Sequence, residues 1–265
     1  MLSEALGDSE SEVRASAVFA LGEMGAAAVP SLISAIDSVY DGVKDSAILA
    51  LGRIGPPAEP AVPVLIRFLD GRNLRLSAVE AVGSIGANAK TAVPQLMAIA
   101  QDLSIGENYR IAAARALGEI GPSADAAVPI LQGMLRFSRD VNMAAVTALG
   151  KIGPTAVPAL IVALKDGNLA TQQIAAASLG KMGPDARQAV PALIEMLRSR
   201  QGPWGRGYGR EAAANALAGI GPAAIDAIPA LMAARNDEEE RVRVAALNAL
   251  KTVKEPPPGG VPGKP

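Results

Sequence analysis

The sequence contains no cysteine and no histidine. The first absence excludes disulfides and thiolate nucleophiles, and the second excludes imidazole bases and most zinc and transition-metal sites. Aromatic residues are also scarce, with 3 Phe, 3 Tyr and 1 Trp, although 50% of the 265 residues are hydrophobic. Because most of that fraction is Ala, Val, Leu and Ile, we expect thin layers of helix packed on helix. No metal or other cofactor is expected.

Neither charge nor hydropathy identifies a partner. The 25 Lys and Arg residues balance 26 Asp and Glu residues, so a net charge of −1 offers no overall basic field for nucleic acid or anionic lipid. No run approaches the roughly 18 apolar residues of a membrane helix. The opening residues, MLSEALGDSESEVR, carry acids where a signal peptide has a basic start. We therefore expect a soluble protein without a membrane partner, with the cytoplasm as its default location.

A pentapeptide of the form Leu-Gly-x-Ile/Met-Gly recurs along the chain every 30 to 38 residues. Its copies begin at Leu21, Leu51, Val82, Leu117, Leu149 and Leu179, with a degraded copy at Leu217 and a last echo at Leu250. Each of the first seven copies is followed by a Val-Pro or Ile-Pro pair, ending at Pro30, Pro63, Pro94, Pro129, Pro158, Pro191 and Pro229. A repeat of this period indicates an array of similar structural units.

Each unit consists of two predicted helices. The segment after the proline, such as PALIVALKD from Pro158, has apolar residues at helical spacing and proline in its first turn; we name it the A helix. The segment ending in the pentapeptide, such as VRASAVFALGEMG from Val13, is rich in alanine and stops at glycine; we name it the B helix.

The two glycines of each pentapeptide have different predicted roles. We expect the final glycine to adopt a left-handed conformation that ends the B helix. The earlier glycine lies inside the last helical turn, where it costs about 1 kcal/mol relative to alanine, so we expect it where two helices approach closely. A nucleotide-clamping G-x-x-G motif is the alternative, but that motif needs basic flanks and a specialised fold rather than six copies in one chain.

These units resemble HEAT repeats, in particular the short bacterial form called phycobilisome-lyase-like, whose pattern is VRxxAAxALGxIGPxAxxAVPxLIxxL. The resemblance covers residues 1–254 and implies an all-α fold: a right-handed α-solenoid of about seven or eight antiparallel helix pairs, as in HEAT and armadillo proteins. The first A helix lacks its opening turn, and Lys251 and Lys254 replace both glycines of the last B helix. We expect a truncated first helix, a polar cap at the end, and a flexible tail or linker over residues 255–265.

In that family an aspartate in the loop between A and B helices typically pairs with an arginine at the start of the B helix. The corresponding pairs here are Asp8 with Arg14, Asp237 with Arg243 and, one residue closer, Asp70 with Arg75. In three other units the arginine is replaced, by Lys44, Asn142 and Gln172. We expect weaker loop anchoring in those units; ordinary solvated loop charges are the alternative.

The family includes binding scaffolds, chromophore lyases, an iron hydroxylase and DNA-alkylation glycosylases, so the fold does not determine the function. The hydroxylases hold two irons with His–Glu pairs, which this chain cannot supply. The glycosylases use aromatic residues and a carboxylate in a basic groove, a poor match for one Trp and no net positive charge. We predict a non-enzymatic scaffold that binds a protein or peptide. The alternatives are a lyase or lyase-like chaperone acting on a tetrapyrrole-bearing protein, and a nucleic-acid-binding protein.

The B helices supply the predicted binding surface, because by resemblance they line the concave side of the solenoid. With the pentapeptide leucine numbered zero, positions −8, −4, −1, 0 and +3 are small or apolar and predicted to be buried, whereas positions −6, −2 and +2 vary and are predicted to be exposed. Apolar residues among alternating charges favour a protein or peptide over a phosphate backbone; an ordinary solvated face is the alternative. The predicted partner-binding residues are Phe19, Leu49, Arg53, Glu80, Arg115, Glu119, Lys151 and Lys181.

A second predicted binding element is the loop RSRQGPWGRGYGRE, residues 198–211, which contains the only tryptophan. Aromatic and arginine side chains together are typical of interface hot spots, and they could also stack on a base. The predicted contact residues are Arg198, Arg200, Trp204, Arg206, Tyr208 and Arg210. The alternative is that the tryptophan folds back to cover a widened gap between helices.

Overall fold

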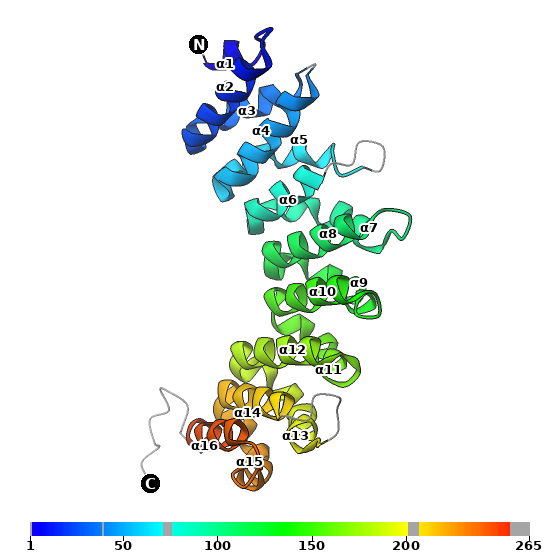
Figure 1. The fold of residues 1–265 in the computed structure, drawn as a ribbon, viewed down its shortest axis with the longest axis vertical. Helices are drawn as coiled ribbons and strands as arrows, with labels where there is room; N and C mark the ends of the chain where they lie inside the picture. Colours follow the sequence, from blue (N-terminus) through cyan, green and yellow to red (C-terminus); the bar gives the residue numbers. More distant parts are fainter. Residues whose placement is uncertain (1, 39, 71–75, 201–206, 255–265) are drawn as a thin grey trace, which may run out of the picture. The chain divides into compact units, whose positions relative to one another are not determined.

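The computed structural model describes residues 2–38, 40–70, 76–200 and 207–254. These residues form α-helices joined by short 3-10 helices and turns, and they contain no β-strand. The chain divides into two compact units, residues 1–134 and 135–265. Figure 1 labels the α-helices of both units. The prediction of an all-α chain of alternating A and B helices is confirmed.

The first unit contains four B helices, each of which contacts the next. They are α2 (Ser11–Glu23), α4 (Asp41–Ile54), α6 (Leu76–Ile85) and α8 (Glu107–Ile120). The A helices of this unit are α1 (Leu2–Ala5), α3 (Val29–Ile36), α5 (Val62–Ile66), α7 (Val93–Gln101) and α9 (Val128–Met134). The 3-10 helices η1 (Gly25–Ala28), η2 (Pro56–Ala61), η3 (Gly86–Ala92) and η4 (Gly121–Ala127) lead from each B helix into the next A helix.

The second unit repeats this arrangement with four B helices in contact with their neighbours along the chain. They are α10 (Arg139–Ile152), α12 (Leu169–Met182), α14 (Tyr208–Ile220) and α16 (Glu240–Lys254). The A helices are α11 (Val157–Asp166), α13 (Val190–Arg198) and α15 (Ile228–Ala234), connected through η5 (Pro154–Ala156), η6 (Gly183–Ala189) and η7 (Gly221–Ala227). Each of these A helices packs on the B helix that follows it. Residues 255–265, the predicted tail, lie outside the described residues.

The core of each unit is formed mostly by the positions that the repeat predicted to be buried, although Val13 and Met24 at two such positions of α2 are exposed. In α10, for example, all five of these positions are buried: Val141, Ala145, Ala148, Leu149 and Ile152. The same leucine at position zero is buried in neighbouring B helices, as in Leu179 and Leu217. Burying a full leucine side chain contributes about 1.5–3 kcal/mol, so this repeated column is a main source of stability.

The final glycine of the pentapeptide follows each B helix except α16 at positive φ, as expected. The predicted left-handed helical conformation is not adopted by Gly55, Gly121, Gly153, Gly183 and Gly221. Gly55, for instance, has φ 71° and ψ −138°, which is an extended conformation essentially restricted to glycine. It turns the chain directly into the following 3-10 helix. The difference in ψ corrects the sequence-based expectation, while the requirement for glycine is confirmed.

The earlier glycine lies where adjacent B helices approach most closely, as predicted. A Cβ atom built on Gly52 would lie 3.0 Å from the Cα atom of Ala81, and one on Gly83 would lie 3.0 Å from the Cα atom of Ala116. These distances are shorter than ordinary van der Waals contacts and involve backbone atoms, which cannot rotate away. Close packing between B helices therefore offsets the low helix propensity of glycine.

We expect Gly83→Ala to lower the free energy of unfolding by about 1–3 kcal/mol, because the added methyl group overpacks the contact between α6 and α8. The matched control is Gly42→Ala in α4, where no atom lies within 4 Å of the added Cβ. That variant should be neutral or more stable, by at most about 1 kcal/mol, since alanine is the better helix former. Urea denaturation followed by circular dichroism measures both; equal effects would contradict the close-contact explanation.

One stretch, Tyr208–Ala234, is long and apolar enough to cross a membrane when judged by length and composition alone. It comprises α14, η7 and α15, and Gly221 at positive φ interrupts it. Several of its leucines and alanines, such as Leu217 and Leu231, are buried within the second unit, whereas Ile225 and Met232 are exposed. Packing between repeats thus accounts for part of the apolar character of this stretch.

Candidate protein-binding surface

The predicted exposed face of the B helices is exposed at positions −2 and +2, whereas the prediction is wrong for position −6 in most B helices. We name positions −6, −2 and +2 of each B helix the B-helix stripe. Every residue at position −2 is exposed: Phe19, Leu49, Glu80, Arg115, Thr147, Ala177, Asn215 and Asn248. The predicted residues at position +2 are exposed as well: Glu23, Arg53, Ser84, Glu119, Lys151 and Lys181. Most residues at position −6 are half-buried, so they form the edge of the stripe where it meets the helix packing.

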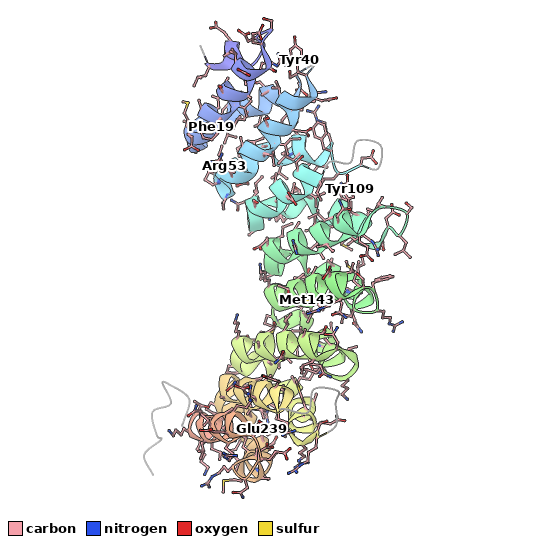
Figure 2. The ribbon with its side chains drawn as sticks, viewed as in Figure 1. Phe19, Tyr40, Arg53, Tyr109, Met143 and Glu239 are labelled. Atoms are coloured by element: carbon pink, nitrogen blue, oxygen red, sulfur yellow. The ribbon has the colours of Figure 1, made fainter. Side chains whose placement is uncertain are left out.

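In the first unit the stripe combines large apolar side chains with an ion pair. Phe19 on α2 (Figure 2) is 60% exposed. Leu49 on α4 is 51% exposed. Arg53 donates a hydrogen bond to Glu23, with 2.7 Å between Nη2 and Oε1, and its guanidinium lies 5.6 Å from the centre of the Phe19 ring. Exposed ion pairs of this kind contribute little to stability. Two exposed apolar side chains, Phe19 and Leu49, therefore lie near an ion pair. This combination suits contact with another protein.

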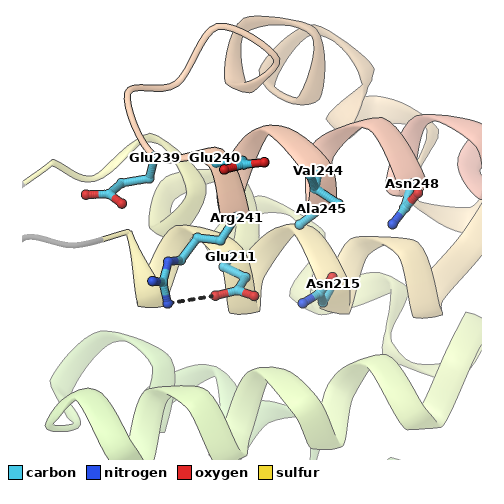
Figure 3. Close-up of a pocket in the computed structure, with 8 residues that line it drawn as sticks. All are labelled: Glu211, Asn215, Glu239, Glu240, Arg241, Val244, Ala245 and Asn248. Atoms are coloured by element: carbon cyan, nitrogen blue, oxygen red, sulfur yellow. Dashed lines mark ion pairs between the residues drawn. The ribbon is translucent and has the colours of Figure 1, made fainter.

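In the second unit the stripe contains a groove of about 530 Å³ between α14 and α16. Four of its lining residues are stripe residues: Glu211 and Val244 at position −6, and Asn215 and Asn248 at position −2. The full lining consists of Glu211, Asn215, Glu239, Glu240, Arg241, Val244, Ala245 and Asn248 (Figure 3). The groove is therefore a direct consequence of two neighbouring B helices that place their variable positions side by side.

The single arginine of the groove is held at one end of it. The Arg241 guanidinium lies 4.2 Å from the centre of the Tyr208 ring, and its Nη1 atom is 3.9 Å from Oε2 of Glu211. Figure 3 shows Arg241 reaching from α16 toward Glu211 on α14, whereas Asn215 and Asn248 lie farther along the groove. The groove thus has a charged end and an amide-bearing end.

A buried ion pair connects the start of α14 to the turn that precedes α16. Arg210 is 5% exposed and Asp237 is 8% exposed, and two hydrogen bonds of 2.9 Å join Nε and Nη2 of Arg210 to the two carboxylate oxygens. Arg210 was predicted to bind a partner as part of the 198–211 loop. The structure does not support this role, because the guanidinium is buried and forms a bidentate ion pair with a carboxylate of the next repeat.

The protonation equilibrium of this pair favours its charged form. Burial raises the pKa of Asp237, but hydrogen bonds from Arg210 and from the backbone N–H of Glu239 outweigh burial and hold the pKa below its ordinary value. The hydrogen bond to Asp237 raises the pKa of Arg210. Bidentate, charge-assisted geometry is the strong form of such a pair.

The sequence contains a signal that would have identified Arg210 correctly. Arg210 occupies position −7 of its B helix, the same position as Arg14 and Arg243. At this position the structure repeatedly places a side chain that reaches the following repeat. The Arg14 guanidinium lies 4.0 Å from the centre of the Tyr40 ring, and Asn142 accepts a hydrogen bond from Thr171 with 2.5 Å between the oxygens.

The predicted pairs between loop aspartates and position −7 have a different geometry from the one expected. Arg14 donates to the backbone carbonyls of Asp8 and Ser9, at 2.8 Å each. Arg243 likewise donates to the carbonyls of Asp237 and Glu238, at 2.8 and 2.9 Å. The arginine therefore anchors its loop through main-chain oxygens, which leaves the Asp237 carboxylate for the preceding repeat. The third predicted pair cannot be compared, since Arg75 lies outside the described residues.

At position −7, at least one residue that replaces the arginine still anchors its loop. Asn142 donates from its amide nitrogen to the Leu135 carbonyl, which reproduces the role of the arginine in its own loop. Lys44 instead forms an ion pair with Asp41 on the same helix, at 3.4 Å. The expectation of weaker anchoring in these units stays a prediction.

The structure describes only part of the 198–211 loop. Trp204 and Arg206 lie outside the described residues. Arg198 and Arg200 are exposed, and Arg200 is close enough to Asp237 to help lower the pKa of that carboxyl group. Tyr208 is exposed at the start of α14 and contacts Arg241 at the end of the groove. The described end of the loop therefore adjoins the B-helix stripe of the second unit.

The family model for HEAT repeats matches residues 1–83 and 136–207, which is more than half of the chain, and the model for the PBS lyase HEAT-like repeat matches residues 109–136. No curated protein sequence matches the chain.

Two of three similar solved structures, with TM-scores of at least 0.60, show the similarity of fold. An engineered protein has a TM-score of 0.60 at 23% identity, over 96% of this chain and 78% of that chain. The Kap95:Nup1 complex has a TM-score of 0.62 at 13% identity, over 95% of this chain and 41% of that one. The CpcE–CpcF complex of phycocyanin lyase from Nostoc sp. has a TM-score of 0.48 at 22% identity, over 95% and 94%. Identities this low show a shared fold and leave the activity to the residues.

Proposed function

Since this chain belongs to the HEAT-repeat family, we propose that it is a non-enzymatic scaffold that binds a protein or peptide along the B-helix stripe. The observation that carries the proposal is the exposure of position −2 in every described B helix, on helices that contact one another within each unit. Continuous exposed faces of this kind suit an extended ligand that crosses several helices.

The chemistry of the stripe supports a protein or peptide ligand. Exposed apolar side chains, such as Phe19 and Leu49, alternate with charges of both signs, such as Arg53 and Glu80. Protein interfaces combine apolar contact with a polar rim in this way, whereas a nucleic-acid surface is strongly basic. Kap95, whose fold this chain resembles, was solved in complex with Nup1, which gives an example of a protein ligand on a solenoid of this class.

A lyase-like role on a tetrapyrrole-bearing protein is the second candidate, favoured by the match of residues 109–136 to the PBS lyase HEAT-like repeat. That segment includes most of α8, whose stripe residues Arg115 and Glu119 are exposed. In this role the stripe would also bind a protein, so the identity of the partner distinguishes the two candidates.

Site-specific photo-crosslinking in the source cells tests the proposal. A photoreactive amino acid placed at Leu49 or Asn215 on the stripe should capture a discrete protein partner, identified by mass spectrometry. The controls are Ala98 on α7 and Glu195 on α13, which are exposed on A helices and should capture little. Capture of a tetrapyrrole-bearing protein would favour the lyase-like role. Equal capture from the A-helix positions, or none from the stripe, would contradict the proposal.

A further inference from the structure

We propose that the groove between α14 and α16 binds a lysine or arginine side chain of an extended peptide segment. This inference rests on the proposed function, and it names the class of ligand that one part of the stripe selects. Three independent features of the groove lead to it: the balance of charge, an apolar surface beside the charges, and two facing amides.

The charge of the groove favours a cation. Three carboxylates line it, from Glu211, Glu239 and Glu240, against the single guanidinium of Arg241. That guanidinium is already paired with Glu211 and stacked on Tyr208, so it does not neutralise the other two carboxylates. A basic side chain would complete the charge balance, whereas a phosphate or a ligand carboxylate would be repelled.

The apolar surface of the groove distinguishes a long basic side chain from a simple cation. Val244 is 50% exposed and lines the groove together with Ala245, next to the carboxylates at the start of α16. Lysine and arginine place their methylene stems on apolar surface while the charged head stays in a polar environment. The juxtaposition of an exposed valine and three glutamates matches both parts of such a side chain.

Two amides provide for the peptide backbone. Asn215 and Asn248 come from adjacent B helices and line the same groove (Figure 3). A carboxamide offers both a hydrogen-bond donor and an acceptor, as does each peptide unit of an extended chain. The groove volume of about 530 Å³ is within the usual range of roughly 300–1,000 Å³ for ligand clefts. The amides would hold the backbone while the acidic end selects the side chain.

Selection from a library of random nonapeptides tests the inference with the full-length chain. The bound peptides should be enriched in lysine or arginine at one or two positions. The double variant Glu211→Gln with Glu240→Gln should lose this enrichment and bind the best basic peptide about three- to tenfold more weakly. The wild-type affinity for that peptide should also fall as salt increases. The charge-matched control is the double variant Glu12→Gln with Glu59→Gln, at exposed positions of the first unit. It should retain the enrichment in basic peptides and the wild-type affinity for the best one.

The possible outcomes separate this inference from the proposed function. One outcome is that peptides bind without any preference for basic residues, while the double variant Asn215→Ala with Asn248→Ala lowers their affinity. In that case the charge inference is wrong and the binding function stands. Enrichment of acidic peptides would overturn the inference as well. If the wild-type chain selects no peptide at all, the inference fails together with peptide binding by this groove. Circular dichroism of each variant confirms that the helices are intact.

Discussion

Replacing Asp237 with alanine should lower the free energy of unfolding by about 3–5 kcal/mol, because it removes the buried, bidentate partner of the Arg210 guanidinium and leaves only the longer, 3.4 Å contact with the exposed Glu238. The cost of an unpaired buried charge exceeds the net gain from forming the pair, so a single substitution has a large effect. Urea denaturation followed by circular dichroism measures this loss in the free energy of unfolding. The matched control is Asp37→Ala, which removes a pair with Arg67 at a similar distance of 2.8 Å, but with both side chains more than half exposed.

The control should change stability by no more than about 1 kcal/mol, since solvent screens an exposed pair. Equal effects of the two substitutions would show that burial does not determine the contribution of the pair. The direction of the pKa shift adds a pH signature. Because the folded state holds the pKa of Asp237 below its ordinary value, the stabilisation is present above the unfolded pKa of about 3.9. It is lost as the pH falls through the lower, folded pKa.

The difference in stability between wild type and Asp237→Asn should therefore be constant from about pH 5 to pH 8 and should shrink below about pH 4. The asparagine variant keeps the shape of the side chain and removes its charge. The Arg210 guanidinium, Glu238 and the exposed Arg200 surround the carboxyl group, so their charges enter the same titration. A difference that instead grows in acid would contradict the assigned direction of the shift.

Replacing Leu160 with alanine should lower the free energy of unfolding by about 2–5 kcal/mol, because Leu160 in α11 is completely buried. The loss combines the transfer free energy of the removed methylene and methyl groups with the cavity left between α11 and its neighbours. Each repeat contacts mainly its neighbours along the chain, so the destabilisation should be concentrated in the second unit. Hydrogen exchange measured by mass spectrometry would locate it, and urea denaturation would give its size.

Leu103→Ala is the chemically matched control, since the same atoms are removed from a side chain that is 64% exposed. That substitution should change stability by no more than about 0.5 kcal/mol. If Leu160→Ala were tolerated as well, the column of apolar residues would not be the main source of stability. If exchange increased equally in both units, stability would not be local to the repeats.

Several properties of this protein follow from the sequence by itself, because they depend on interactions between residues close along the chain. The spacing of the pentapeptides predicts the B helices, proline marks the start of the A helices, and glycine marks the turn between them. Exposure at positions −2 and +2, as at Leu49, and burial at position zero, as at Leu149, are confirmed by the structure, whereas the predicted exposure of position −6 is wrong for most B helices. Helical periodicity and the conformational freedom of glycine are local effects, which explains why a pattern of letters predicts them.

Only the tertiary structure decides which side chains of neighbouring repeats meet. The sequence placed Arg210 in a binding loop, whereas the stacking of α14 against α16 buries it against Asp237, 27 residues away. The same stacking brings Asn215, Asn248 and Glu240 to one groove. The register between adjacent helices sets these contacts, and it depends on packing at positions such as Gly83 against Ala116, where less than one ångström decides whether a side chain fits.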